Sequence, residues 1–330
     1  MVDVYAQICR GRPVCLPNVS LGKGEKMISL PRSVLIREVG LRDGLQNEKS
    51  FIATEDKIAL AWALTEAGLK EIEATSFVSP QAVPQMRDAL QVVKALGNPA
   101  GVSFSALVVN TRGAEDAIAA GVRELQVVAT CSETHSAKNV RMTVEQALAE
   151  IEAIAGLAGE HGVIMRVALS TVFGCPYEGK IPYDRVYALV ERLLALGMAR
   201  VALSDTAGLG NPLHVSEICH GILTRFPEGD FSLHIHDTRG MGLACVTAGV
   251  WSGIRVIESS IGGLGGCPFI PHATGNIATE DVVYLLEAMG VQTGLDWPKL
   301  LAAALLAEKI IGRELGSRQL ALARGRFCVN

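Results

Sequence analysis

The sequence lacks a strong excess of either charge, and it lacks long hydrophobic runs. Its net charge is −4 and its isoelectric point is about 6.0, so it offers no basic field to a nucleic-acid backbone or an anionic membrane. No stretch approaches the roughly 18 uncharged apolar residues that a membrane-spanning helix needs. We therefore expect neither a nucleic acid nor a membrane as a partner.

Paired cysteine motifs are also missing. The 330-residue chain has eight cysteines and no CxxC, which argues against a disulfide scaffold and favours a reducing compartment. Residues 1–32 contain no apolar stretch of signal-peptide length, and we interpret them as an N-terminal extension. We expect a cytoplasmic protein. The mitochondrial matrix is the alternative, because basic residues outnumber acidic ones in this extension.

What the sequence does have is an apolar composition arranged in a regular alternation. Hydrophobic residues make up 49% of the chain and charged residues 19%, enough for a large core. From Ser33 onward, short β-branched runs alternate with helical patterns. The predicted strands are Val34–Val39, Glu71–Ser76, Val102–Val108, Glu124–Ala129, Val163–Leu169, Arg200–Leu203, Phe231–His236 and Arg255–Ser259. The predicted helices lie near 54–68, 82–96, 112–120, 143–158, 183–197, 212–225, 240–252, 279–289 and 297–312.

Eight strand–helix units predict an α/β fold, the closed (β/α)8 TIM barrel. We expect one barrel domain over residues 33–315 and a C-terminal tail over 316–330. The alternative, a doubly wound open sheet, calls for a glycine-rich phosphate loop after the first strand, where the sequence has Arg42–Leu45 instead. In a barrel, function lies where the strands end, so polar residues at strand ends are the informative ones.

Two histidines lie two positions apart on the seventh predicted strand. Side chains alternate between the faces of a strand, so Phe231, Leu233 and Ile235 would meet the helices, while His234 and His236 would point into the barrel. A lone histidine is more often a core or surface residue. A pair on one inward face at a strand end favours a metal site, because both rings can reach one cation.

Charged residues also follow the first and second predicted strands. Asp43 is a candidate ligand for the same cation, and Arg42 is a candidate group for a substrate oxyanion; the alternative is a surface ion pair in a turn. On the second strand, alternation predicts Glu71, Glu73 and Thr75 on one face. Acids that point into a barrel need partners, because an unpaired buried charge is strongly destabilising.

A glycine-rich run, Gly262–Gly266, follows the eighth predicted strand and leads into Cys267. It does not open a helix, so it is not a phosphate loop. A thiol on a glycine-hinged lid suits proton transfer, whereas burial is the ordinary alternative and nucleophilic Cys/His catalysis a competing one. Asn276 follows and can supply an amide oxygen. Asp205, after the sixth strand, either supports the site or caps a helix.

These stretches together resemble the 3-hydroxy-3-methylglutaryl-CoA lyase family, within the wider group of metal-dependent barrel lyases and acyl-CoA Claisen enzymes. The matching stretches follow in order over about residues 33–315: Glu38–Lys49, Thr75–Pro80, Val83–Met86, Gly174–Ile181, His234–Thr238, Gly263–Pro268 and Gly275–Asp281.

The resemblance implies a divalent cation, Mg²⁺ or Mn²⁺, held by Asp43, His234, His236 and Asn276. The mixed nitrogen and oxygen ligands do not select one metal.

The resemblance also implies three catalytic residues. Arg42 would polarise the acyl carbonyl and stabilise enolate charge, Glu73 would anchor the site by hydrogen bonding, and Cys267 would take part in proton transfer. The implied reaction is retro-Claisen cleavage of 3-hydroxy-3-methylglutaryl-CoA to acetyl-CoA and acetoacetate. A homodimer is implied as well.

Departures from the family pattern leave the substrate open. Leu41 stands where proline is usual, Ala202 where serine is usual and Arg239 where tyrosine is usual, and Ile270–His272 replaces a smaller stretch. Arg239 and His272 are either candidates for binding the carboxylate of a shorter acid or ordinary surface residues. (R)-Citramalyl-CoA, which would give acetyl-CoA and pyruvate, is therefore an alternative substrate, since one methylene is worth only about 1–3 kcal/mol in a pocket.

Two further classes are alternatives. A condensing enzyme of the same group would run the Claisen direction with a 2-oxo acid, but such enzymes usually carry an added C-terminal regulatory region. A non-catalytic metal-binding barrel is the other class, and the presence of Arg42, Glu73 and Cys267 beside the cation ligands argues against it.

Overall fold

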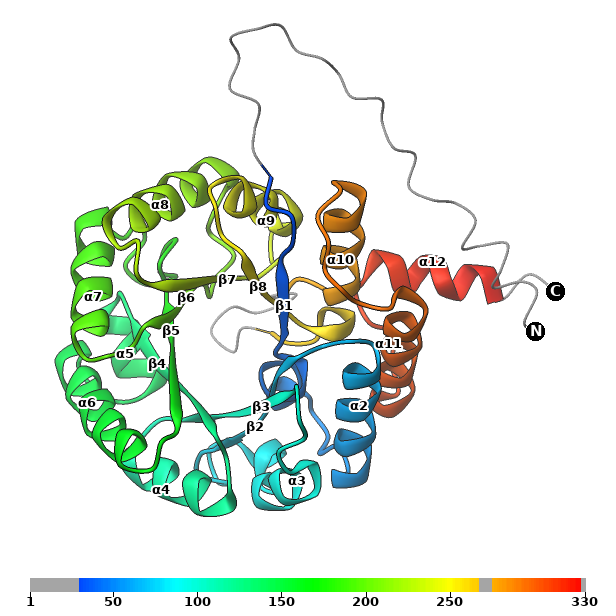
Figure 1. Cartoon of the computed structure of the whole chain (residues 1–330), viewed down its shortest axis with the longest axis horizontal. Helices are drawn as coiled ribbons and strands as arrows, with labels where there is room; N and C mark the ends of the chain where they lie inside the picture. The colour runs from blue at the N-terminus through cyan, green and yellow to red at the C-terminus, as the bar shows by residue number, and fades with distance from the viewer. Residues whose placement is uncertain (1–29, 267–274, 328–330) are drawn as a thin grey trace, which may run out of the picture.

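The computed structural model describes residues 30–266 and 275–327. Its centre is a closed barrel of eight parallel strands, each paired with its neighbours in chain order (Figure 1). The predicted (β/α)8 barrel is confirmed. The strands are β1 (Leu35–Glu38), β2 (Glu71–Phe77), β3 (Ser103–Val108), β4 (Glu124–Thr130), β5 (Ile164–Ser170), β6 (Arg200–Asp205), β7 (Asp230–Ile235) and β8 (Val256–Ser259).

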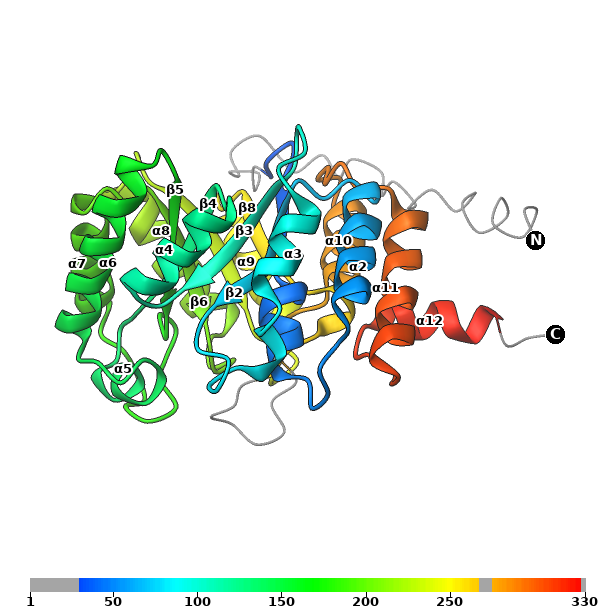
Figure 2. The same ribbon diagram turned by 90° about the horizontal axis from the view of Figure 1, so that it is seen from below.

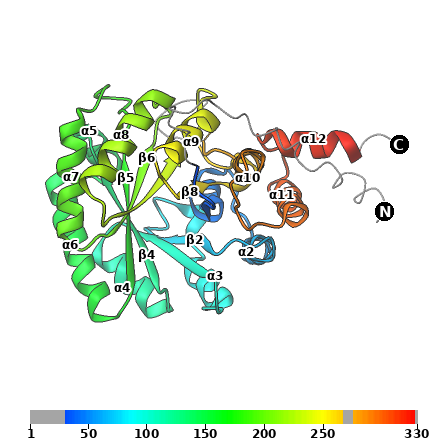
Figure 3. The ribbon, with the colours of Figure 1, turned by 45° about the horizontal axis from the view of Figure 1, so that its top comes forward.

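Helices surround the barrel (Figure 3). Their buried apolar residues and those of the strands form one hydrophobic core. They are α2 (Thr54–Glu66), α3 (Ala89–Leu96), α4 (Thr111–Ala120), α5 (Glu133–Asn139), α6 (Val144–Glu160), α7 (Tyr183–Ala195), α8 (Pro212–Arg225), α9 (Gly242–Trp251), α10 (Thr279–Ala288), α11 (Trp297–Ile311) and α12 (Arg318–Phe327). Short helical turns are η1 (Gly40–Gly44), η2 (Leu45–Asn47), η3 (Pro84–Met86) and η4 (Ile261–Gly263).

Local sequence explains where several helices begin. Thr143 accepts from the backbone N–H of Gln146, and the Gln146 side chain accepts from the N–H of Thr143, which is the reciprocal capping box that a threonine followed three residues later by glutamine favours. Asn110 and Asn211 cap α4 and α8 in the same way with their side-chain oxygens. These caps satisfy backbone donors that the first turn leaves free.

Three helical segments differ from the prediction. The helix expected near 82–96 divides into η3 and α3. The seven-residue α5 was not predicted, because its sequence has no apolar period. The segment 316–330, expected as a tail, includes α12, which lies outside the barrel's ring of helices beyond α11 (Figure 2).

Ion pairs fill the barrel interior toward the starts of the strands. Arg37 contacts Glu71 at 2.6 Å and Glu258 at 2.7 Å, and Arg166 pairs with Glu71 and Glu124. Each of these five charged groups therefore has a partner of opposite charge, as burial requires. The candidate functional site lies at the other end of the barrel, where the strands end.

One irregularity changes the facing of β2. The register with β3 shifts between Glu73 and Thr75, and the hydroxyl of Thr75 contacts the sulfur of Met86 in η3 at 3.8 Å. The bulge breaks the simple alternation, so Thr75 does not stay on the face of Glu71 and Glu73 as predicted.

Within the described parts of the chain, no helix is both long and apolar enough to cross a membrane.

Candidate metal and active site

Asp43 is carried by the turn directly after β1. The chain leaves β1 in a π-type turn, η1, which is the kind of local distortion that frequently lies at functional sites. The backbone N–H of Asp43 donates to the carbonyl of Val39 at 2.7 Å. The turn thereby aims the carboxylate across the barrel mouth.

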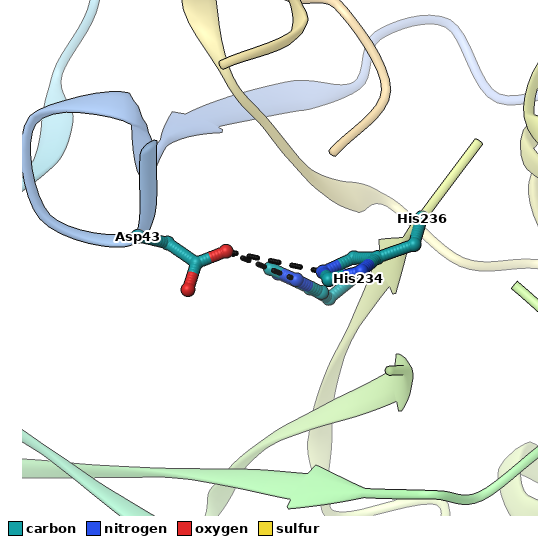
Figure 4. Close-up of side chains that lie close together, drawn as sticks. All are labelled: Asp43, His234 and His236. Atoms are coloured by element: carbon teal, nitrogen blue, oxygen red, sulfur yellow. Dashed lines mark ion pairs between the residues drawn. The ribbon is translucent and has the colours of Figure 1, made fainter. Parts of the chain in front are cut away.

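His234 and His236 reach the same point from the end of β7. The Nε2 atom of each ring lies 3.9 Å from Oδ2 of Asp43, and Figure 4 shows the carboxylate facing both imidazoles. One ligand atom from each of the three residues lies within 4.8 Å of the others. The structure thus brings together three of the four predicted cation ligands.

Asn276 adjoins these three residues. It forms an isolated bridge with His236, and its amide nitrogen donates to Oδ2 of Asp43 at 2.6 Å and to the carbonyl of Leu264 at 3.2 Å. Its amide oxygen is buried and has no hydrogen-bond partner among the described residues. The predicted fourth ligand is therefore at the site, with its nitrogen turned toward Asp43.

The donor set fits a divalent cation. Two imidazole nitrogens and one carboxylate oxygen face one another at distances too long for hydrogen bonds, and a buried amide oxygen without a partner lies beside them. Nitrogen and oxygen donors in this combination suit a range of divalent metals. A cation would satisfy groups that the described protein leaves unsatisfied.

The ionisation of two of these groups, Asp43 and His236, favours a cation as well. Burial lowers the pKa of His234, but its hydrogen bond to Glu258 and the nearby carboxylates outweigh burial and raise that pKa overall. Burial acts against the charge of Asp43, but the neighbouring Arg42, His234 and His236 outweigh it and lower its pKa to about 2. Burial and the charge of His234 lower the pKa of His236 to about 4. Asp43 is thus an anion and His236 a neutral imidazole near pH 7, the forms that bind metals.

Arg42 and Glu73 form a buried pair beside the three ligands. Arg42 donates to Oε2 of Glu73 and to Oδ1 of Asp43, at 2.7 and 2.8 Å. Burial lowers the pKa of Arg42, but the two carboxylates outweigh it and raise that pKa overall, so the guanidinium stays charged. Its Nε atom is buried without a partner among the described residues and is a donor available to a substrate oxygen.

Sequence reasoning missed Glu258. This β8 carboxylate lies 3.2 Å from Nδ1 of His234, on the side of the ring away from Asp43. An acid within an apolar strand is a signal in itself. Its pairing with His234 depends on the register between β7 and β8, which one sequence does not reveal.

The remaining candidates have different outcomes. Cys267 and His272 lie outside the described residues. Asp205 accepts from the backbone N–H groups of Leu209 and Gly210, both at 2.9 Å, so it caps the turn after β6. Arg239 is exposed and donates from one nitrogen to two backbone carbonyls of that same turn, at 2.8 Å each.

Comparison with known proteins identifies the family of the chain. A family model described as HMGL-like matches residues 33–306. The chain belongs to the HMGL-like family. Among similar proteins, the hydroxymethylglutaryl-CoA lyase YngG of Bacillus subtilis is 44% identical over 290 residues, which covers 88% of this chain and 97% of that protein.

Solved structures place this HMGL-like chain in the same group. The crystal structure of the Bacillus subtilis HMG-CoA lyase is 44% identical, covers 89% of this chain and 99% of that one, and has a TM-score of 0.87. An HMG-CoA lyase from Acinetobacter baumannii, solved with coenzyme A and 3-methylmalate, is 38% identical, covers 90% and 97%, and has a TM-score of 0.85.

Proposed function

We propose that the chain is a divalent-cation-dependent lyase that cleaves 3-hydroxy-3-methylglutaryl-CoA into acetyl-CoA and acetoacetate. The observation that carries the proposal is the convergence of Asp43, His234 and His236 beside the buried Arg42–Glu73 pair, in a chain 44% identical to a hydroxymethylglutaryl-CoA lyase over 290 residues. The chemistry requires both parts: a group that makes a tertiary alcohol acidic, and a cation for the enolate that follows.

Bond cleavage sets the tasks of the residues. The C3 hydroxyl gives its proton to solvent, the C2–C3 bond breaks as C3 becomes the ketone of acetoacetate, and the electron pair of that bond passes to the enolate of the thioester. Protonation at C2 then gives acetyl-CoA. When bound, a divalent cation lowers the pKa of a hydroxyl that it contacts.

The protein's own groups account for the other tasks. Asp43, His234 and His236, with the amide oxygen of Asn276 turned inward, would hold Mg²⁺ or Mn²⁺. Arg42 would donate to the thioester oxygen, where charge develops in the transition state.

Glu73 forms a buried ion pair with Arg42 and so would hold the guanidinium in one orientation while the substrate reacts. We assign proton delivery at C2 to Cys267, because a thiol is a suitable general acid and this one follows the glycine-rich run after η4.

Other properties belong to the same proposal. We propose one catalytic domain over residues 33–315, with 1–32 as an N-terminal extension and 316–330 as a C-terminal segment that includes α12, acting as a homodimer on an acyl-CoA. Four described cysteines are free and buried, which is consistent with the cytoplasm and also with the mitochondrial matrix.

The test is product analysis with two substrates. The purified chain with Mn²⁺ is given 3-hydroxy-3-methylglutaryl-CoA or (R)-citramalyl-CoA, and acetyl-CoA, acetoacetate and pyruvate are measured. We expect acetyl-CoA and acetoacetate from the first at the higher kcat/KM. Pyruvate as the faster product would replace the substrate assignment. Cleavage of neither by folded protein would leave the condensing enzyme and the non-catalytic barrel.

A further inference from the structure

We propose that Glu258 is a positioning residue, which holds His234 with its proton on Nδ1 and its Nε2 lone pair aimed at the cation. The proposal rests on the metal site of the proposed function. It adds a residue from the barrel interior that touches neither substrate nor metal and acts through His234.

The contacts around the His234 ring are asymmetric. Nδ1 lies 3.2 Å from Oε2 of Glu258, and Nε2 lies 3.9 Å from Oδ2 of Asp43. A carboxylate only accepts hydrogen bonds, so a neutral ring beside Glu258 carries its proton on Nδ1. The other nitrogen then keeps its lone pair for the metal. His236 has no equivalent support, because its Nδ1 has no partner among the described residues.

The carboxylate of Glu258 is held in place by hydrogen bonds from neighbouring strands. Its Oε1 accepts from Arg37 at 2.7 Å and from the hydroxyl of Ser232 at 2.8 Å, and its side chain is only 4% exposed. This leaves Oε2 as the oxygen that faces His234. Arg37 also pairs with Glu71 at 2.6 Å. A chain of contacts therefore runs from the ion pairs near the starts of the strands to the candidate metal site at their ends.

The strand register makes this arrangement possible. Glu258 pairs with His234 across β7 and β8, so the two side chains start from the same level inside the barrel. Glu71 belongs to the same network of ion pairs but has no contact with His234. It therefore provides a matched control: the loss of its charge perturbs the network without touching the ring.

A glutamine at position 258 is the sharpest change. Arg37 and Ser232 need an acceptor, so the amide oxygen would face them and the amide NH₂ would face Nδ1 of His234. An NH₂ group donates, which favours the ring form with its proton on Nε2, and that form cannot ligate through Nε2. Supporting partners of metal-bound histidines are typically worth about 10–100-fold in metal affinity.

The experiment measures Mn²⁺ binding to the full chain by electron paramagnetic resonance of the free ion. Unfolding midpoints confirm that each variant is folded. We expect Glu258→Gln to weaken Mn²⁺ binding by about 10–100-fold and Glu71→Gln to leave it within about twofold. An unchanged affinity in Glu258→Gln overturns the proposal. An equal loss in Glu71→Gln does so too, because the effect would then belong to the whole network.

A second measurement needs no variant at position 258. Long-range ¹H–¹⁵N spectra of ring-labelled wild-type protein with Mg²⁺, assigned with His234→Gln, report which nitrogen of His234 bears the proton. We expect Nδ1; a proton on Nε2 overturns the proposal even if Glu258→Gln does not fold.

Asp43→Asn separates the two claims. If wild-type protein binds no Mn²⁺, or if binding survives Asp43→Asn, the metal site of the proposed function fails and the role of Glu258 fails with it. If Asp43→Asn abolishes binding while Glu258→Gln does not change it, the role of Glu258 alone is wrong.

Discussion

At the scale of single residues, the site is built from charges that compensate one another. Arg42 lies between two carboxylates, Asp43 and Glu73, and remains a cation although it is buried. The same guanidinium lowers the pKa of Asp43 and so favours the anion that a metal requires. Positioning and ionisation therefore depend on the same contacts.

Replacement of Arg42 by lysine tests this double role. Lysine keeps the charge that Glu73 needs but loses the planar fork of donors. We expect Arg42→Lys to lower kcat by about 10²–10³, the usual loss when a transition-state donor is removed. Titration with Mn²⁺ is expected to give a nearly unchanged affinity. A kcat close to wild type would show that Arg42 does not contact the developing charge.

Arg239 provides a test of substrate choice. Its nitrogen donates to the carbonyls of Ala207 and Gly208, so it supports the turn after β6 instead of presenting a free charge. We expect Arg239→Tyr to leave the ratio of kcat/KM for (R)-citramalyl-CoA and 3-hydroxy-3-methylglutaryl-CoA unchanged. A ratio that moves about tenfold, equivalent to roughly 1.4 kcal/mol, would return Arg239 to the specificity argument.

The candidate site residues could be predicted from the sequence because polar and charged residues at the ends of predicted barrel strands indicate a functional site. The parity of His234 and His236 placed both rings inside the barrel, and the structure confirms that placement. Glu258 was missed because its contact depends on strand register. Thr75 was assigned to the wrong face because the bulge after Glu73 has no local sequence signal.

At the scale of elements, the turn η4 follows β8 and contains the first two residues of the glycine-rich run, and two buried acids hold it. The N–H of Ile261 donates to Glu38 at 2.8 Å, and the N–H of Gly262 donates to both oxygens of Glu280 at 3.1 and 3.0 Å. Leu315 packs directly on Gly262. The start of this run is therefore anchored from three sides.

Gly262 is a sensitive position in this turn. Its φ is +65°, and an added Cβ would lie 2.3 Å from Cδ1 and 2.9 Å from Cβ of Leu315. We expect Gly262→Ala to lower the free energy of unfolding by about 1–3 kcal/mol more than Gly290→Ala. Gly290 has a φ of +78° with open space around it, so it controls for backbone strain alone. Equal losses in urea unfolding would contradict the packing argument.

Element boundaries were predictable where a period or a cap marks them. The capping box of α6 and the apolar period after Thr143 fixed that helix from sequence. The polar sequence of α5 offers no such period, and its cap at Ser132 was not recognised. In the structure, α5 follows directly after β4 and packs against β4 and α6, contacts that its own sequence does not reveal.

At the scale of the whole molecule, buried acids make stability depend on pH. Burial raises the pKa values of Glu38 and Glu280 to about 7, because their backbone and hydroxyl donors only partly compensate for lost water. Because each carboxyl group binds its proton more tightly in the folded state, its protonation stabilises the fold fully at pH values below the unfolded pKa of 4.5. This contribution is lost as the pH rises through the folded pKa of about 7. Each acid therefore opposes folding in alkaline solution.

Glu38→Gln isolates one of these contributions. A neutral amide mimics the protonated acid, so we expect the free energy of unfolding of the variant, relative to wild type, to rise by about 2–3 kcal/mol between pH 5 and pH 8. The opposite trend of His236, whose pKa is lowered, cancels in this comparison. Glu115→Gln, an exposed acid on α4, controls for the loss of one negative charge. A pH-independent difference would show that Glu38 is ionised throughout.

The barrel as a whole brings Asp43, after β1, beside His234 and His236, at the end of β7, and a divalent cation bound between them is needed for the proposed cleavage. The most direct measurement is acetyl-CoA release from 3-hydroxy-3-methylglutaryl-CoA by protein stripped with EDTA, before and after Mn²⁺ is added back. We predict no release from the stripped protein, full recovery in wild type and none in Asp43→Asn. Continued cleavage by the stripped protein would show that the reaction does not need a divalent cation at this site.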